Sequence, residues 1–265
     1  MLVIKLGGSA GIDYEAFLDD LARVEEPVVF IHGGNAELDR VSRQLGIEPR
    51  HVTSSSGQSS RFTDRETLDA MLMVYCGKIN KTLVEGLQRR GVNAVGLSAL
   101  DGRIAVGRRK SAIRVIEDGK PKMLRGDYAG SIEEIDARLL TLLLGAGYLP
   151  VLTPPALSRE GEAINVDGDK LATEIAVALG ADRLLVFSNT PGLLADVRDE
   201  RSLVASISLA NLAEADAMAQ GRMKKKVGAA ADAIERGVGQ VIFADARVER
   251  PIARALEGAG TTISA

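Results

Sequence analysis

The sequence predicts an α/β fold, a three-layer αβα sandwich whose central sheet is mainly parallel and carries β-hairpins at its edge. Short, strongly apolar runs recur along the 265 residues, and helical patterns separate almost every pair of them. The first two runs each end in a pair of glycines, which is typical of strands that present their carboxyl ends to a ligand.

The first third of the chain alternates strands and helices. The expected elements are, in order, strand 2–6, helix 14–24, strand 27–32, helix 36–45, helix 64–90 and strand 93–98. Thr63 and Glu66 have the T-x-x-E spacing of a capping box, which predicts the start of the long helix. The cap would hold Arg61 in a structured place at the mouth of that helix.

Between residues 101 and 128 the pattern changes. Two Asp-Gly pairs separate short β-prone runs, which predicts antiparallel hairpins added to the edge of the main sheet. The later elements are then helix 132–145, strand 148–154, helix 168–180, strand 183–188, two helices between 208 and 236, strand 240–244, a last helix and strand 261–264. No linker divides the chain, so we expect a single domain over residues 1–265.

Composition excludes several classes of protein. Apolar residues make up 46% and charged residues 26%, which is close to the globular average. No run of about 18 apolar residues occurs, and a strand already begins at residue 2, so we expect neither a leader nor a membrane span, and a cytoplasmic protein. One cysteine and two histidines, without C-x-x-C or H-E-x-x-H spacing, make a protein-held metal an unfavoured interpretation.

The two glycine pairs predict an anion site. Lys5 lies in the first strand and residues 7–8 are both glycine, while residues 33–34 repeat the pattern after the second strand. Glycine lets backbone N–H groups approach an anion closely, and a following helix adds a positive dipole. Either turn alone is explained by tight strand-to-helix packing, but two turns beside a lysine favour phosphate. Neither has the spacing of a P-loop or of a dinucleotide fingerprint.

Three later stretches add polar groups. Asn165, Asp167 and Asp169 precede a predicted helix, where an ordinary N-cap turn is the alternative. Residues 188–192, Ser-Asn-Thr-Pro-Gly, end a strand in a turn suited to a nucleotide rim. Residues 224–226 are three lysines at the start of an amphipathic helix, where cations oppose the helix dipole unless an anion is nearby.

These motifs together resemble the amino acid kinase family. The matching stretches are, in order, KLGG, HGGN, the arginine of SSRFTD, INVDGD, SNTPGLL and GRMKKKV. Within the family the sequence is most similar to the acetylglutamate kinase branch, and there to kinases of aminoadipate joined by its amino group to a small acidic carrier protein in lysine biosynthesis. The stretches behind this closer similarity are VYCGKIN, LSALDGR, VGRRK, RGDYAG and LTPPALS.

The resemblance implies a carbamate kinase-like fold and transfer of the ATP γ-phosphoryl to a side-chain carboxylate, giving an acyl phosphate, with Mg²⁺ held by ATP phosphates and water. A carboxylate is already ionised near neutral pH, so the reaction needs charge stabilisation and in-line positioning rather than a general base. It also implies that residues 1–150 bind the amino acid and form the dimer, and that residues 151–265 bind ATP. Kinase activity on free N-acetylglutamate, or on both acceptors, is the first alternative, and a non-catalytic amino acid or nucleotide sensor is the second.

The resemblance also implies roles for single residues. Lys5 would neutralise the phosphoryl group from the acceptor side and Lys226 from the ATP side, while Asp169 would orient both lysines. Backbone N–H groups of Gly8 and Gly33 would bind the moving phosphoryl. The amino acid would be held by Gly34, Asn35, Asn165 and Arg61, the last gripping its α-carboxylate. The nucleotide would be held by Gly7, Ser188, Asn189, Thr190, Pro191, Gly192, Leu193 and Leu194.

Three positions depart from the family pattern. Asn35 replaces a third glycine after the histidine, Asp167 replaces the middle asparagine of the N-x-N-x-D run, and Asn189 replaces the aspartate of the S-D-x-x-G turn. All three lie near the implied substrates, and they weaken the case for N-acetylglutamate. The helix that senses arginine in some acetylglutamate kinases is absent before strand 2–6, which favours a homodimer over an arginine-regulated hexamer.

A basic segment completes the sequence features. Residues 103–125 carry eight basic and two acidic side chains, a charge of +6, and the rest of the chain carries −9. A charged edge hairpin protected from aggregation is one explanation. Docking of the acidic carrier is another, with candidate contacts at Arg103, Arg108, Arg109, Lys110 and Arg114. Nucleic-acid binding is disfavoured, because the segment has no aromatic residue on which a base could stack.

Overall fold

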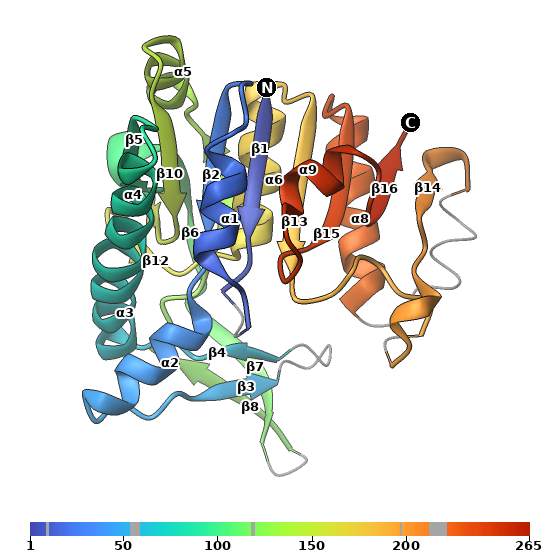
Figure 1. Cartoon of the computed structure of the whole chain (residues 1–265). Helices are drawn as coiled ribbons and strands as arrows, with labels where there is room; N and C mark the ends of the chain where they lie inside the picture. Colours follow the sequence, from blue (N-terminus) through green and yellow to red (C-terminus); the bar gives the residue numbers. More distant parts are fainter. Residues whose placement is uncertain (9–10, 54–58, 118–119, 197, 212–221) are drawn as a thin grey trace.

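The computed structural model describes residues 1–8, 11–53, 59–117, 120–196, 198–211 and 222–265. In these residues an eight-stranded sheet lies at the centre, with helices on both faces (Figure 1). In spatial order its strands are β14 (Ser206–Ser208), β16 (Thr261–Ser264), β15 (Gln240–Asp245), β13 (Arg183–Ser188), β1 (Leu2–Leu6), β2 (Val28–His32), β10 (Leu149–Thr153) and β5 (Ala94–Ser98).

The sheet is mainly parallel, as predicted. All neighbouring pairs from β15 to β5 are parallel, whereas β16 runs antiparallel to β15, and β14 follows the direction of β16. The carboxyl ends of β1, β2, β10, β13 and β15 therefore meet at one edge. In Figure 1 this edge faces the small strands β3, β4, β7 and β8.

Two apolar cores flank the sheet, as expected for a three-layer fold. Three helices cover one face: α1 (Tyr14–Leu21), α4 (Asn80–Arg89) and α9 (Pro251–Leu256). Three others cover the opposite face: α5 (Arg138–Gly145), α6 (Gly168–Leu179) and α8 (Arg222–Glu235). Since side chains alternate along a strand, each central strand contributes to both cores.

The long helix predicted over residues 64–90 is present. It consists of α3 (Arg65–Met71), a π-helical segment η1 (Leu72–Ile79) and α4. The predicted capping box is wrong by one residue, because Asp64 accepts the backbone N–H of Thr67 at 2.9 Å. Asp64, one residue closer to the first turn, caps the helix in place of Thr63, whose hydroxyl instead accepts a hydrogen bond from Asn165. The preceding helix, α2 (Asn35–Gln44), also matches its prediction.

Two other expectations need correction. The helix predicted at 132–145 begins only at Arg138, since residues 130–135 form strand β9 (Gly130–Ile135). The predicted hairpins do not extend the main sheet. Strand β9 joins a separate four-stranded sheet with β6 (Ala105–Arg109), β11 (Ala156–Ser158) and β12 (Ala163–Ile164), while β7 (Ala112–Glu117) pairs with β8 (Lys120–Arg125), and β3 (His51–Thr53) with β4 (Ser59–Arg61).

The hairpin β7–β8 is anchored beside β3 and β4. Ile113 and Leu124 of the hairpin pack with Val52 and Phe62 in a small apolar cluster. Of the two helices predicted between 208 and 236, α8 is present, and the other falls on residues 212–221, outside the described ranges. No helix in the described residues has the length and apolar character needed to cross a membrane.

Candidate active site

The two glycine turns lie side by side. Strands β1 and β2 pair so that Leu6 is opposite His32, and each strand runs directly into its glycine pair. The carbonyl of Gly8 accepts the backbone N–H of Ala36 at 3.1 Å. A Cβ atom at Gly8 would lie only 2.2 Å from the backbone nitrogen of Gly34, far inside contact distance. Glycine is therefore required at Gly8 by this contact.

The two turns differ in the donors that they offer. The N–H of Gly33 donates to the carbonyl of Leu6 at 3.0 Å, and so it is already used in holding the two strands together. The N–H of Gly8 has no backbone acceptor in the described part of the chain. Of the two backbone donors implied by the resemblance, Gly8 is thus the one available to an anion, and the donor role of Gly33 is not supported.

A buried pair of side chains fixes the second turn. His32 donates from Nδ1 to the carbonyl of Gly33 at 3.0 Å and accepts at Nε2 from Nδ2 of Asn80 at 3.1 Å. Asn80 also donates to the carbonyl of Val151 at 2.9 Å, which ties α4 to β10. Burial lowers the pKa of His32 to about 4, against a weaker opposing effect of its bond to Gly33. His32 is therefore neutral near pH 7, and its hydrogen bonds hold the second glycine turn in position.

Lys5 and Asp169 form an ion pair beside the glycine turns. Val3 belongs to the core under α6, so Lys5, two residues further along β1, faces the same side. Its Nζ lies 2.5 Å from Oδ1 of Asp169 in the first turn of α6. Asp167 is the N-cap of this helix and accepts the N–H of Lys170 at 2.9 Å, so the ordinary capping interpretation holds for that residue.

Lys226 faces the same region from α8. Lys5 pairs with Val186 on β13, and Val186 pairs with Phe243 on β15, so these three residues share one rung of the sheet. The Nζ of Lys226 lies 5.5 Å from the centre of the Phe243 ring. Burial acts to raise the pKa of Asp169, but attraction to Lys5, with a smaller effect of Lys226, leaves that pKa below its usual value. The structure thus gathers two cations around one carboxylate.

Arg61 lies at the end of β4 and contacts α2, the helix that follows the second glycine turn. Its guanidinium is almost fully buried, and Nη2 is 2.6 Å from Oδ1 of Asp39 on α2. Within the described residues, Nη1 of Arg61 has no hydrogen-bond partner. A buried cationic N–H group without an acceptor is costly, so this side of the guanidinium is suited to an incoming anion.

Asn165 is tied to the same segment as Arg61. Its Nδ2 donates to Oγ1 of Thr63 at 2.9 Å, and its backbone N–H donates to the carbonyl of Tyr128 at 2.8 Å. Thr63 in turn donates its backbone N–H to the buried carboxylate of Asp127 at 3.0 Å. Burial raises the pKa of Asp127, although N–H groups of Thr63 and Ala129 and nearby cations oppose the shift.

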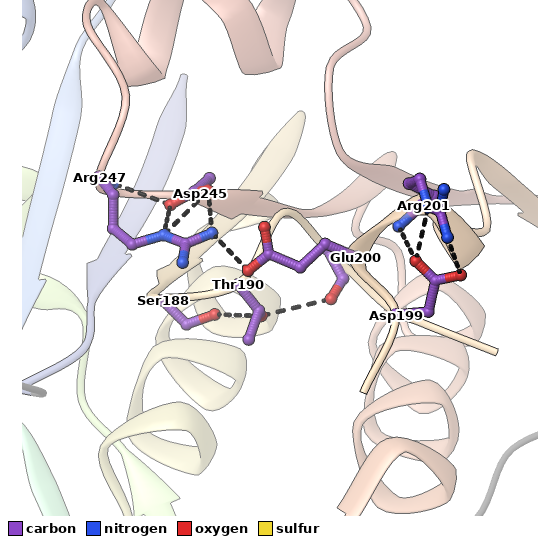
Figure 2. A network of polar contacts seen from close by, with 8 residues as sticks. Ser188, Thr190, Asp199, Glu200, Arg201, Asp245 and Arg247 are labelled. Atoms are coloured by element: carbon purple, nitrogen blue, oxygen red, sulfur yellow. Dashed lines mark hydrogen bonds and ion pairs between the residues drawn. The ribbon is translucent and has the colours of Figure 1, made fainter. Parts of the chain in front are cut away.

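The predicted nucleotide turn follows β13. Ser188 and Thr190 share a hydroxyl contact of 3.0 Å, and Thr190 donates to the carbonyl of Gly192 at 3.3 Å (Figure 2). The side chain of Asn189 is exposed at the tip. Gly192 has φ +157° and lies against Thr261, where a Cβ would be 2.7 Å from Oγ1. The Gly192 end of this turn is therefore packed tightly against Thr261, while Asn189 at its tip is exposed.

Leu193 and Leu194 do not fit a side-chain role in nucleotide binding. Both are buried, and Leu193 is part of the core under α6 and α8. The N–H of Leu193 is also used, since it donates to Oγ1 of Thr261 at 2.9 Å. Two leucines in succession after a turn are simply the return of the chain to the core. Gly7 likewise packs under the site, because its N–H donates to the carbonyl of Phe187 at 2.9 Å.

An acidic and basic cluster borders the nucleotide turn. Figure 2 shows Arg247 beside Asp245 at the end of β15, with its Nη2 2.9 Å from Glu200. The backbone N–H of Ala246 donates to the carbonyl of Ser188 at 2.8 Å. The ends of β13 and β15 are thereby joined, and Arg247 holds the segment after the nucleotide turn in place.

The basic segment is spread over several elements. Arg108 and Lys110 are exposed at the end of β6, although Arg108 has an ion pair with Glu133 at 3.1 Å. Arg114 is exposed on the hairpin strand β7, and Arg103 is exposed in a turn after β5. These four cations remain available to a partner.

Arg109 is a correction to the predicted docking set. Its guanidinium stacks on the ring of Tyr128 at 3.5 Å and pairs with Glu162 at 3.0 Å, while Nε donates to the carbonyl of Asp127 at 2.9 Å. These contacts are all within the protein, so Arg109 anchors the RGDY turn, and its place in the predicted docking set is not supported.

Comparison with known proteins decides the family. A model of the amino acid kinase family matches residues 1–245. The chain belongs to the amino acid kinase family. It is 56% identical to a [LysW]-aminoadipate kinase of Deinococcus radiodurans, over all of this chain and 91% of that protein, and 54% identical to a [LysW]-aminoadipate kinase of Thermus thermophilus, over 99% of this chain and all of that protein. An acetylglutamate kinase of Methanopyrus kandleri is 36% identical over 99% of this chain and all of that protein.

Solved structures of other amino acid kinase-like proteins share the fold. An N-acetylglutamate synthase from Neisseria gonorrhoeae superposes with a TM-score of 0.79, over all of this chain and 59% of that one, at 22% identity. A Giardia carbamate kinase gives a TM-score of 0.68 over 99% and 98% of the two chains, at 16% identity. The predicted carbamate kinase-like sandwich is confirmed.

Sequence reasoning missed several residues that shape the site of this family member. Thr63, Tyr75 and Asp127 each contact a predicted site residue or its neighbour, and none of them belongs to a glycine turn or a cation cluster. The T-x-x-E spacing predicts a helix cap at Thr63 and gives no sign of its bond to Asn165. The burial of a charged residue such as Asp127 is visible only once the fold is known.

Proposed function

We propose that this protein is an ATP-dependent kinase of carrier-linked 2-aminoadipate, which it phosphorylates on the side-chain carboxylate to give an acyl phosphate. The convergence of Lys5, Asp169 and Lys226 at the carboxyl ends of β1, β13 and β15 is the observation that carries the proposal. The two relatives above 50% identity, both named [LysW]-aminoadipate kinase, support this acceptor.

The chemistry follows from repulsion between the reactants. A carboxylate acceptor is ionised already, and it must approach a polyanionic triphosphate. In our proposal Lys5 offsets charge from the acceptor side and Lys226 from the nucleotide side, while Asp169 holds the lysine amines and limits their mutual repulsion. The N–H of Gly8 donates to an equatorial oxygen of the phosphoryl group as it moves. Preorganised donors of this kind act most strongly where water is excluded.

The acceptor is held from its α-carboxylate. Nη1 of Arg61, which has no hydrogen-bond partner in the described part of the chain, supplies a buried cationic donor for that group, and Asn165 contacts the rest of the amino acid. The nucleotide lies against the turn from Ser188 to Gly192. The described residues contain no cluster of three or more His, Cys, Asp or Glu side chains that suits a metal ion. In our proposal Mg²⁺ is carried by the ATP phosphates and water.

The activity test compares acceptors. The purified protein is supplied with ATP, Mg²⁺ and either carrier-linked aminoadipate, carrier-linked glutamate or free N-acetylglutamate, and the acyl phosphate is trapped with hydroxylamine. We expect the highest kcat/KM with carrier-linked aminoadipate. Preference for N-acetylglutamate would instead support the alternative that the Methanopyrus relative represents. ADP release with none of them would favour a sensor.

We propose that the exposed cations Arg103, Arg108, Lys110 and Arg114 receive the acidic carrier. Arg114 lies on the hairpin β7–β8, which packs against β3, and β3 pairs with the strand that bears Arg61, so this cation lies near the proposed amino-acid site. Opposite charges across such a contact raise the rate of encounter. The carrier LysW is mentioned in the names of the two relatives above 50% identity.

Charge reversal tests the docking surface. In R108E/K110E/R114E the KM for carrier-linked substrate should rise about tenfold or more at low salt, and the difference should shrink as salt rises. The KM for N-acetylglutamate should stay within twofold of the wild type. The matched control is R89E, at the far end of α4, which should change neither value. Equal effects on both acceptors would exclude docking at these residues.

We also propose a homodimer formed by the amino-acid half. Strand β5 is the edge strand of the main sheet on that side, and the neighbouring long helix exposes Met73, 56% accessible, on its outer face. An exposed apolar side chain next to an open sheet edge is typical of a self-association surface. Light scattering should give twice the chain mass, and Met73→Lys should lower it. A wild-type protein with the mass of one chain would contradict the proposal.

A further inference from the structure

Tyr75 is a buried residue of the long helix that contacts the second glycine turn. It lies in the π-helical segment Leu72–Ile79 and is 4% exposed. A Cβ atom at Gly34 would lie 2.8 Å from Cε1 of Tyr75 and 2.3 Å from Cδ1 of Ile79. The Tyr75 ring therefore packs directly against the first residues of α2, where the acceptor and the phosphoryl group are proposed to meet.

The hydroxyl of Tyr75 reaches the residue after this turn. It donates to Oδ1 of Asn35 at 3.0 Å, and the backbone of Gly34 lies close enough to oppose the upward effect of burial on its pKa. The hydroxyl gives its one proton to Oδ1 of Asn35, so the oxygen end of the amide is the end that faces the ring. Oδ1 faces Tyr75, and the Nδ2 group of Asn35 must face away from it.

The Nδ2 group of Asn35 is left without an acceptor among the described side chains and backbone. The Asn35 side chain is exposed, and its backbone nitrogen lies 2.7 Å from where a Cβ of Gly8 would be. The backbone of Asn35 thus lies beside Gly8, at the contact between the two glycine turns. Tyr75 is also close enough to Arg61 and Asp39 for both charges to act on its pKa, after the dominant upward effect of burial. An acceptor that reaches from Arg61 to Gly8 passes the Asn35 amide.

We infer that Tyr75 is a positioning residue that orients the Asn35 amide, so that Nδ2 of Asn35 donates to the acceptor's side-chain carboxylate and contributes to acceptor selection. The inference rests on the proposed kinase function. Burial keeps the phenol protonated at any pH at which the enzyme works, because it raises a pKa that is already near 10. The phenol therefore keeps the proton that it donates to Oδ1 of Asn35, and in our inference a carboxylate meets the Nδ2 donor rather than the amide oxygen.

A double-mutant cycle tests this coupling. Tyr75→Phe keeps the ring and removes only the hydroxyl, and Asn35→Ala removes the amide. Each should raise the KM of the acceptor about five- to tenfold, the cost of one hydrogen bond, while the KM of ATP and kcat stay within twofold. Tyr75→Phe added to Asn35→Ala should have no further effect on acceptor KM. Tyr148→Phe, a partly exposed tyrosine before β10, is the matched control and should match the wild type.

A second variant guards against misfolding of Tyr75→Phe. Asn35→Asp retains an oxygen for the Tyr75 hydroxyl but replaces the Nδ2 donor with an anionic oxygen at an exposed position, and it should raise acceptor KM more than Asn35→Ala. Additive effects in the cycle, or an unchanged acceptor KM in Asn35→Asp, overturn the inference while leaving the kinase function intact. A wild-type protein that phosphorylates no acceptor overturns the proposed function, and this inference falls with it.

Discussion

Replacing Gly8 with alanine tests the contact between the two glycine turns. The added Cβ would lie 2.2 Å from the nitrogen and 2.6 Å from the Cα of Gly34, and 2.7 Å from the nitrogen of Asn35. All three are backbone atoms, so no side-chain rotation relieves the overlap. Ordinary contact at such a carbon begins near 3.4 Å. The turns must therefore separate by about 1 Å, the difference between 3.4 and 2.2 Å.

A displacement of that size has two consequences. The Gly8 N–H moves relative to Lys5 and α2, and a misplacement of about 1 Å in a phosphoryl-transfer site costs on the order of 10²-fold in kcat. The strain also lowers the free energy of unfolding by about 1–3 kcal/mol, as overpacking does elsewhere. Since the site is displaced rather than filled, the KM of ATP should change less than kcat.

The assay is steady-state ADP release with carrier-linked aminoadipate, alongside denaturant unfolding of the same samples. Gly145→Ala is the matched control, because a Cβ at the end of α5 meets nothing within 4 Å. It should keep full activity and equal or greater stability. A folded Gly8→Ala protein with kcat within threefold of the wild type would refute the argument that the turns must touch.

Three further predictions address other parts of the molecule. Lys5→Met and Lys226→Met should each lower kcat about 10²-fold, the scale expected for a preorganised charge stabiliser, and near-normal turnover of either folded variant would contradict its role. His32 has a native pKa of about 4, below the ordinary 6.5, so the unfolded chain binds a proton at this residue more readily than the folded chain. The contribution of His32 to the free energy of unfolding is therefore complete above pH 6.5. It should be lost as the pH falls through 4, by about 3 kcal/mol. His32→Asn should show a shallower loss than the wild type in denaturant titrations over this range, and equal slopes would refute the shift. Asp20 accepts two backbone N–H groups at the start of α9, at 2.6 and 3.0 Å, so Asp20→Ala should lower the free energy of unfolding by about 2 kcal/mol while Glu25→Ala does not.

The main sheet was predictable because its strands are short and apolar throughout. Runs such as residues 2–6 and 184–187 are buried on both faces, and a parallel sheet between two helical layers is the architecture that accommodates them. The separate four-stranded sheet was not predictable. Strand β9 contains two glutamates, at 133 and 134, and its residues do not alternate strictly between buried and exposed. Both features favour a helix over a strand by propensity. The segment forms a strand because it pairs with β6.

The site was predictable where a residue type is unusual for its position. Lys5 in a buried strand, paired glycines and lysines at a helix start each conflict with local preference, and such conflicts mark function. Residues that serve the site through another residue leave no such signal. Asn80 looks like any polar residue of a long helix, yet it joins His32, β10 and α4 through one amide. Arg109 is the opposite case. Its place in a basic run predicts a surface contact with a partner, but its guanidinium is bound within the protein.

The balance of charge explains how the site can exist without its substrates. Lys5 and Lys226 both act on the carboxylate of Asp169, and this negative charge offsets part of the repulsion between the two amines. Arg61 has the same arrangement with Asp39. In each proposed anion site a carboxylate therefore compensates the cations, while among the described residues Nη1 of Arg61 has no hydrogen-bond partner. Binding a phosphate or an α-carboxylate then completes the set of partners, so the two substrates should stabilise the fold as well as react on it.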